Sequence, residues 1–329
     1  MNNAATTQDS ALASANVLEH ATRRTHAMVF AAMLAVFMGA PFLGVYPVFM
    51  MKVMCFALFA CAFNLLLGFG GLLSFGHAMF IGGAGYAAAH AAKVWGFTPE
   101  LAVLFATFCA GALGWVTGLL AIRRQGIYFA MITLALAQMV FFFSIQAPFT
   151  HGEDGIQAVP RGKLFGLVDL MEPTAMYLFV LTIFVAGFAL IYRIVNSPFG
   201  QVLKAIRENE PRAISLGYDA DRFKHRAFVL SAALSGLAGG TKAILFQLAS
   251  LTDVHWSMSG EVVLMTLVGG MGTIFGPVVG AAVVVTMQNY LAELGAWVTV
   301  VQGLIFVVCV LLFRRGIVGE LGNWLKKSL

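Results

Sequence analysis

The ionisable residues that could do chemistry lie mostly outside the apolar runs of this 329-residue chain. Ion-coupled transporters keep carboxylates or histidines deep in the membrane, but the 15 acidic residues here fall almost wholly in loops and tails. Glu261 begins one apolar run, and Lys242 lies near the end of another, where we expect its long stem to snorkel. His77 and His90 fall inside an apolar run, where a lone histidine usually packs or hydrogen-bonds between helices. His77 is the better functional candidate because it follows a glycine-rich break.

No catalytic constellation is present. Gly162-Lys163 is followed by Leu164, so the chain lacks the G-x-x-x-x-G-K-[ST] loop that cradles ATP phosphates, and it also lacks H-E-x-x-H and G-x-S-x-G. The four cysteines lie in apolar runs without metal-ligand spacing, and we expect them to pack in the core: Cys55, Cys61, Cys109 and Cys309. The sequence therefore predicts no enzyme, no metal site and no cofactor in this chain, and any energy must come from a partner.

The composition is that of a membrane protein. Apolar residues make up 60% of the chain and charged residues only 11%, where a soluble domain carries about 25% charge. One crossing needs about 20 mostly apolar residues, so the chain can hold on the order of ten crossings. We therefore predict an all-α polytopic membrane protein of about ten transmembrane helices, some of them broken at glycine-rich segments.

Ten apolar runs are predicted to span the membrane. They are 27–46, 48–67, 74–94, 101–121, 127–146, 175–194, 228–248, 261–271, 274–291 and 297–313. The first follows a polar tail, lacks a clear cleavage site and is closely followed by others, so it is interpreted as a span and not as a signal peptide. The predicted organisation is an N-terminal tail at 1–26, a transmembrane domain at 27–313 with a long loop at 195–227, and a C-terminal tail at 314–329.

The basic residues predict the orientation. With the N-terminus in the cytoplasm, strict alternation places all but five of the 20 Lys and Arg on the cytoplasmic side. The exceptions are Lys52, Lys93, Arg161, Lys163 and Lys242. Membrane topology therefore accounts for the net charge of +5, and nucleic-acid binding loses its main support. Residues 261–290 are broken by Gly269 to Gly272 and by Pro277, so they can form either one membrane segment or two. Two segments place both termini in the cytoplasm. We prefer two.

Two glycine-rich regions carry most of the information. Gly68 to His77 is too rich in glycine for a regular helix and suits a broken segment whose free backbone groups face a cavity. Helix ends there could meet a charged or zwitterionic solute. In the second region Gly272, Gly276 and Gly280 stand four apart and would form a smooth strip on one helix face. That strip fits close helix packing or, together with the first region, a solute path between two halves.

The long loop has the pattern of two short amphipathic helices. Ser197 can cap a helix with Pro198 at its first position, and apolar residues then recur on one side. Pro211 permits a second short helix, which Gly217 can end. Such helices fit either a membrane-surface anchor or docking into a groove of a soluble partner, and the sequence leaves both open.

Taken together, these residues resemble a family: the permease subunits of branched-chain amino-acid ABC importers, LivM type. The match runs from about Gly68 to about Val285 and rests on four segments. They are Ser74-Phe75-Gly76-His77-Ala78 with Phe80, Gly126 to Ala135, Gly200 to Gly217 followed by Lys224 to Gly239, and Gly269 to Thr273 with Gly276-Pro277. Leu72 and His151 depart from the family pattern, where Gln and Gly are common, and this weakens a specific assignment to leucine, isoleucine or valine.

The resemblance implies roles and partners. A solute path would include Gly70, Ser74, Gly76, His77, Thr133, Gly270 and Gly272. Coupling to an ATPase would use Gly200, Leu203, Ala205, Ile206, Arg207, Glu208 and Gly217. The implied partners are a LivH-type second permease, two cytoplasmic ATPases that bind the ATP, and a periplasmic solute-binding protein, in the lipid of a bacterial inner membrane. The alternatives are a urea or short-amide importer permease and, less favoured, a secondary transporter.

Overall fold

The fold is a bundle of helices. In the computed structural model, the described residues are 25–41, 44–291, 297–312 and 316–324. After a first helix at Thr25–Gly39, the helices are α2 (Pro47–Asn64), α3 (His77–Lys93), α4 (Pro99–Ala121), α5 (Ile127–Gln146), α6 (Pro173–Val195), α7 (Pro198–Glu208), α8 (Glu210–Ser215), α9 (Ala220–Phe246), α10 (Trp256–Gly269), α11 (Gly276–Leu291), α12 (Trp297–Leu312) and α13 (Gly316–Trp324). Proline at the first helical position begins α2, α4, α6 and α7, where its missing N–H leaves no bond unmade.

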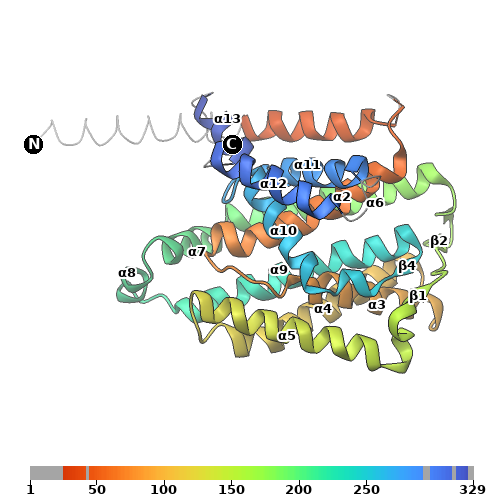
Figure 1. Ribbon diagram of the computed structural model, residues 1–329, viewed down its shortest axis with the longest axis horizontal. Helices are drawn as coiled ribbons and strands as arrows, with labels where there is room; N and C mark the ends of the chain where they lie inside the picture. The colour runs from red at the N-terminus through yellow and green to blue at the C-terminus, as the bar shows by residue number, and fades with distance from the viewer. Residues whose placement is uncertain (1–24, 42–43, 292–296, 313–315, 325–329) are drawn as a thin grey trace, which may run out of the picture.

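Helices α2 and α9 form the centre of the bundle (Figure 1). Of the apolar stretch in Pro47–Phe69, 89% is buried inside the chain, against 28% for Ile127–Gln146. Small residues allow α9 to approach its neighbours closely: a side chain at Gly240 would meet Ala106 of α4 and Ala88 of α3. The outer helices keep large apolar side chains such as Phe108 and Met139 exposed, which suits lipid or another apolar subunit.

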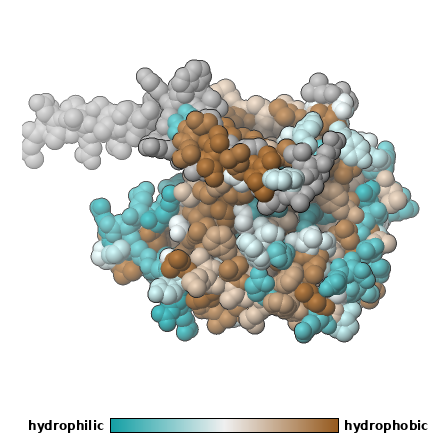
Figure 2. All heavy atoms as spheres, viewed as in Figure 1, coloured by the Kyte–Doolittle hydropathy of each residue, from teal (hydrophilic) through white to brown (hydrophobic). Residues whose placement is uncertain are grey.

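Each of the ten predicted spans contains a helix. Among the described residues, five helices are long and apolar enough to cross a membrane: Pro47–Phe69, Pro99–Ala121, Ile127–Gln146, Pro173–Val195 and Ala220–Phe246. The remaining apolar helices are shorter. Figure 2 shows mostly hydrophobic surface between hydrophilic ends over α7 and α8 on one side and over β1, β2 and β4 on the other. The all-α membrane fold is thus confirmed, and the count of ten crossings remains a prediction.

The first glycine-rich region breaks the chain as predicted. Helix α2 passes into a π-helical turn, η1 (Leu65–Phe69), after which Gly71 has φ +70°. The chain then runs without helix until α3 begins at His77. Irregular backbone at membrane depth is tolerated only where protein buries it or where it lines a water-filled cavity. The irregular segment is therefore an integral part of the bundle.

The second glycine-rich region forms a helical hairpin. Helix α10 ends at Gly269 and α11 begins at Gly276, so two segments replace one long helix, as preferred from the sequence. A side chain at Gly280 would meet the backbone of both Met265 and Gly269, which places the two helices side by side and antiparallel. Gly272 lies in the connection with φ +80°, so the expectation that it shares a helix face with the other glycines is wrong. The remaining strip serves close packing.

Short strands and the long loop lie at opposite ends of the bundle (Figure 1). β1 (Ile156–Gln157) pairs antiparallel with β4 (Leu248–Ala249), and β2 (Lys163–Leu164) pairs with β3 (Val168–Asp169). At the other end, the Ser197 hydroxyl accepts a hydrogen bond from the Gly200 N–H at 3.3 Å and caps α7. Gly217, with φ +89°, follows α8. The predicted pair of short helices is confirmed.

The cysteines behave as core residues where the structure describes them. Cys55 and Cys61 are buried and Cys109 is half-buried, while the side chain of Cys309 lies outside the described residues. Within the described ranges, no three His, Cys, Asp or Glu side chains gather in a way that could hold a metal ion. The predictions for residues 1–24, 314–315 and 325–329 also fall outside the described residues.

We expect the substitution Gly280→Ala to lower the melting temperature of the detergent-purified protein. The added methyl group would collide with the Met265 carbonyl oxygen, and overpacking of this kind costs about 1–3 kcal/mol. Gly303→Ala in α12 is the matched control, because nothing lies within 4 Å of the added carbon. Thermal unfolding followed by intrinsic fluorescence measures both, and equal melting temperatures would contradict the packing of the hairpin.

Candidate functional site

Helix α7 lies directly on the first glycine-rich break. The Arg207 guanidinium donates a hydrogen bond to the carbonyl oxygen of Gly68, which belongs to the π-helical turn. The stem of Arg207 crosses Gly71, where an added Cβ would lie 3.0 Å from the Arg207 Cγ. A charged donor to a backbone oxygen makes a stronger hydrogen bond than a neutral one. Arg207 thus connects the long loop to the end of α2.

Two other side chains of α7, those of Leu203 and Lys204, also lie against the first glycine-rich break. An added Cβ at Gly70 would lie 3.7 Å from a methyl group of Leu203, and the Lys204 ammonium lies 5.4 Å from the centre of the Phe69 ring. Partial burial lowers the pKa of the Lys204 ammonium, while the Glu208 carboxylate acts in the opposite direction. Leu203 and Lys204 of α7 therefore lie against the break beside Arg207.

Asn64 joins the two glycine-rich regions. Its side-chain amide donates to the carbonyl oxygen of Thr273 at 2.8 Å, and its side-chain oxygen accepts from the N–H of Gly272 at 3.0 Å. Gly272 also packs against Gly68 and Arg207: an added Cβ there would lie 3.2 Å from the Arg207 Nη1 atom. We call these five residues, Asn64, Gly68, Arg207, Gly272 and Thr273, the glycine junction.

Three other predicted path residues lie together in a second place. Thr133 on α5 accepts the Phe75 N–H with its hydroxyl at 3.2 Å, and the Ser74 hydroxyl accepts the Gly76 N–H at 3.2 Å. Ser74 and Thr133 are both 0% exposed, and a side chain at Gly76 would collide with the Thr133 backbone. These residues satisfy the backbone of the extended segment, and in this conformation they do not line an open path.

His77 makes a helix-to-helix hydrogen bond. Its Nε2 lies 2.9 Å from the Ser231 hydroxyl, which itself donates to the carbonyl oxygen of Ala62 at 2.6 Å. Because that hydroxyl has one proton, His77 must carry its proton on Nε2. The ring is fully buried and meets the Phe63 and Phe80 rings edge-on, with centroids at 4.8 and 5.4 Å. The packing role expected of a lone histidine is therefore the one that the structure supports.

The last predicted path residue, Gly270, has φ +125° and lies against the start of α13. A Cβ at Gly316 would collide with the Gly270 backbone, so the C-terminal helix begins on the second glycine-rich region. The other six predicted path residues are divided between two places. Gly70 and Gly272 lie at or beside the glycine junction, whereas Ser74, Gly76, His77 and Thr133 lie deeper in the bundle.

The predicted coupling residues divide into an inner and an outer face of the loop. Gly200, Leu203 and Ile206 are buried, and Ile206 packs with Ala213 and Ala220. The outer face is exposed and contains Ala205, Glu208 and Gly217, with Arg207 reaching from it to the junction. The apolar face of α7 is therefore already occupied by the protein itself.

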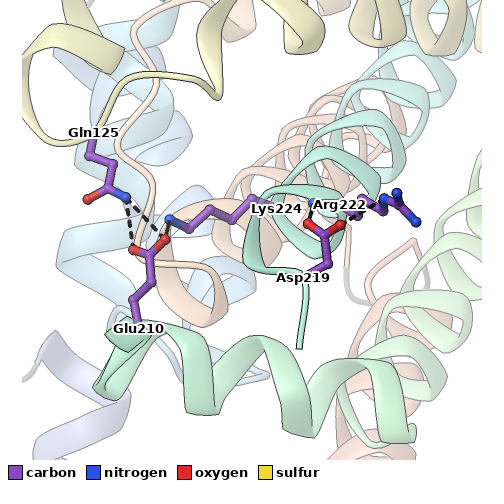
Figure 3. Close-up of polar contacts among 5 residues, drawn as sticks. All are labelled: Gln125, Glu210, Asp219, Arg222 and Lys224. Carbon is purple, nitrogen blue, oxygen red and sulfur yellow. Dashed lines mark hydrogen bonds and ion pairs between the residues drawn. The ribbon is translucent and has the colours of Figure 1, made fainter. Parts of the chain in front are cut away.

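A partly buried ion pair fixes α8 to the bundle (Figure 3). The Lys224 ammonium lies 2.6 Å from a Glu210 carboxylate oxygen, and the Lys224 side chain is only 5% exposed. The Gln125 amide, from the connection between α4 and α5, donates to both Glu210 oxygens at 3.1 Å. Asp219 and Arg222 also pair at 2.8 Å, but both are exposed and contribute little. Glu210 thus joins the loop to two other parts of the chain.

Sequence reasoning missed Asn64, did not find the partner of Lys224, and misjudged Lys242. Asn64 could have been found as the lone amide inside an apolar run, and Lys224 carried no signal for its partner. Lys242 was expected to snorkel, and this is wrong: it forms an ion pair with Asp253, and the two side chains are 14% and 16% exposed. Asp253 follows α9 in the 3₁₀ turn η4 (Leu251–Asp253), too far along the chain for helix periodicity to predict the pair.

We expect Asn64→Leu to lower the melting temperature, because it leaves the Gly272 N–H and the Thr273 carbonyl without their partner. An unpaired buried polar group costs roughly 1–3 kcal/mol. Asn196→Leu is the matched control: its amide donates only to Tyr192 at 2.9 Å, and the side chain is exposed. If both variants unfold at the wild-type temperature, the junction does not hold the two glycine-rich regions together.

The chain is similar in sequence to known transport proteins. No solved structure matches the chain. The chain is 25% identical to the high-affinity branched-chain amino acid transport system permease protein LivM of Salmonella typhimurium and to that of Escherichia coli, in each case over 80% of this chain and 68% of the relative. It is 28% identical to the ribose import permease protein RbsC of Bacillus subtilis, over 67% of this chain and 70% of the relative. The sequence profile of one family matches residues 46–310, so the chain belongs to the permease components of branched-chain amino acid transport systems.

Proposed function

We propose that this chain is a permease subunit of an ABC importer that moves branched-chain or other hydrophobic amino acids into the cytoplasm, driven by partner ATPases. The observation that carries the proposal is the contact of Arg207 in α7 with Gly68 and Gly272, because it connects a solvent-facing loop to both breaks in the membrane bundle. The named relatives supply the substrate class.

The packing of α7 favours docking to a soluble partner over anchoring on the membrane surface. An anchor needs a free apolar face to enter the bilayer. Leu203 and Ile206 are 0% and 2% exposed, so that face is already covered by the chain. Exposed Ile214 of α8 and Leu216, which follows it, remain available beside the polar face, and this combination suits a groove on an ATPase subunit.

ATP-driven closure of two ATPase subunits would move α7, and Arg207 would transmit that movement to the glycine junction. The extended segment after Gly71 would then change shape, and access would switch from outside to inside. Gly71 and Leu73 are exposed in this chain, so the segment faces the place where a second, LivH-type permease would complete the path. Ser74, Gly76, His77 and Thr133 would hold the segment in position, and Gly70, Gly270 and Gly272 would shape its inner end.

The remaining partners follow from the same orientation. A periplasmic binding protein would dock at the end of the bundle that carries β1 to β4, in a bacterial inner membrane with both termini in the cytoplasm. A urea or short-amide importer would use the same architecture, and the ribose permease among the relatives shows that related chains carry other solutes. Uptake of leucine, urea and ribose by the complete transporter in proteoliposomes, each with its binding protein, tests the substrate class. We expect ATP-dependent leucine uptake, and uptake of urea or ribose alone would overturn the proposal.

We expect Ala205→Glu to reduce the ATPase activity stimulated by the loaded binding protein by roughly tenfold or more, because a buried unpaired charge in the docked interface costs several kcal/mol. Ala205 is exposed in the free chain, so the protein should still fold and reach the membrane. Ala205→Ser is the control and should keep wild-type stimulation. Ile206→Asp is a poorer test because Ile206 is buried within the loop and its change would unfold α7. Wild-type stimulation in Ala205→Glu would exclude this face as the ATPase contact.

A further inference from the structure

Two lysines and two carboxylates lie together at the end of the bundle opposite α7. Lys52 is near the start of α2, Lys242 is near the end of α9, Asp253 lies in η4, and Glu261 is in the first half of α10. Both lysine ammonium groups lie against the Phe56 ring, at 5.1 Å for Lys242 and 6.0 Å for Lys52. Charged residues within apolar helices are costly, and they are kept where they bind or pair.

The four charges are not paired alike. Lys242 and Asp253 form an ion pair. Lys52 has no carboxylate within 4.0 Å among the described residues, although Glu261 and Asp253 both act on it electrostatically. Glu261 is mostly buried, is hydrogen-bonded by Gln288, and has no ion pair within the described part of the chain. One cation and one anion therefore remain neighbours without direct contact.

A third polar group in the cluster is also without a partner. The Tyr86 hydroxyl on α3 is buried and accepts or donates no hydrogen bond among the described residues, and the residue is only 4% exposed. The charge of Asp253 acts on it, so it belongs to the same cluster. A buried hydroxyl without a partner is expensive, and a site built to bind a polar ligand is one reason to keep it.

The pattern of an unpaired cation beside an unpaired anion matches the head of an α-amino acid. Its carboxylate can pair with Lys52 while its ammonium, on the same carbon, pairs with Glu261, so both charges are satisfied at once. Urea and ribose carry no charge and would leave both side chains unpaired, which gives discrimination against them. The Phe56 ring would hold the Lys52 ammonium in place and present an apolar surface to the rest of the solute.

We propose that Lys52 and Glu261 form a recognition site for the zwitterionic head of an α-amino acid at the outer end of the transport path. The Lys242–Asp253 ion pair and Phe56 position Lys52, and the Tyr86 hydroxyl provides an additional hydrogen-bonding group beside Asp253. This inference rests on the proposed amino-acid import function and adds to it a residue-level basis for selecting charged over uncharged solutes.

The test uses the complete transporter in proteoliposomes, with leucine as the probe and its loaded binding protein. Leucine uptake and stimulated ATPase activity are measured in parallel for Lys52→Met, Glu261→Gln and the charge-keeping Lys52→Arg. Lys93→Met and Glu100→Gln are matched controls. Both side chains hydrogen-bond to loop backbone outside the cluster, at 2.8 Å for Lys93 and 3.1 Å for Glu100. We expect the first two variants to lose leucine uptake by roughly tenfold, since each removes one charged contact to the solute.

In those two variants the stimulated ATPase activity should stay within about twofold of wild type, because α7 and the glycine junction are unchanged. Lys52→Arg and both controls should transport as wild type does. Equal loss of uptake and ATPase activity, loss of assembly in both Lys52→Met and Glu261→Gln, or unchanged uptake would each overturn the recognition site. If the wild-type transporter carries urea or ribose but not leucine, the proposed function itself fails. If the wild-type transporter carries leucine and the variants carry it equally well, only the recognition site fails.

Discussion

The contact between Arg207 and the Gly68 carbonyl oxygen is the interaction on which the arrangement of this bundle depends. A π-helical turn releases a backbone carbonyl from the regular hydrogen-bond ladder, and in an apolar surrounding that group needs a donor. The donor comes from α7, on a loop nearly 140 residues further along the chain. The Arg207 hydrogen bond therefore joins the end of α2 directly to α7.

Asn64 extends this connection to the second half of the chain. It supplies both a donor and an acceptor, and both are used on the backbone of the second glycine-rich region. An amide is suited to this because it satisfies an N–H and a carbonyl at the same time without a charge. Two breaks that are far apart in sequence are thus held by the same side chain, and glycine at 68 and 272 permits the backbones to meet.

The arrangement of charged side chains differs between the two ends of the bundle. At the end that carries α7 and α8, charged groups are paired or solvated: Glu210 with Lys224, and Asp219 with Arg222. At the other end, Lys52 and Glu261 remain neighbours without an ion pair. In the proposed function, the first arrangement would position the docking surface for an ATPase, and the second would retain charge for a solute. Because a buried charge without a partner is costly, the difference between the ends marks where binding energy is available.

The amino-acid sequence by itself determined the helical membrane class, the positions of both glycine-rich breaks and the two short helices of the loop. These depend on local pattern: apolar runs set the helices, glycine ends them, and Ser197-Pro198 begins a new one. Which polar groups meet was decided only by the tertiary structure. Asn64 contacts residues 208 and 209 positions away, and Lys242 finds a partner in the turn after its own helix instead of the solvent. Such partners depend on how whole helices pack, and hydrophobic periodicity in a chain that is apolar nearly all round does not specify which faces approach one another.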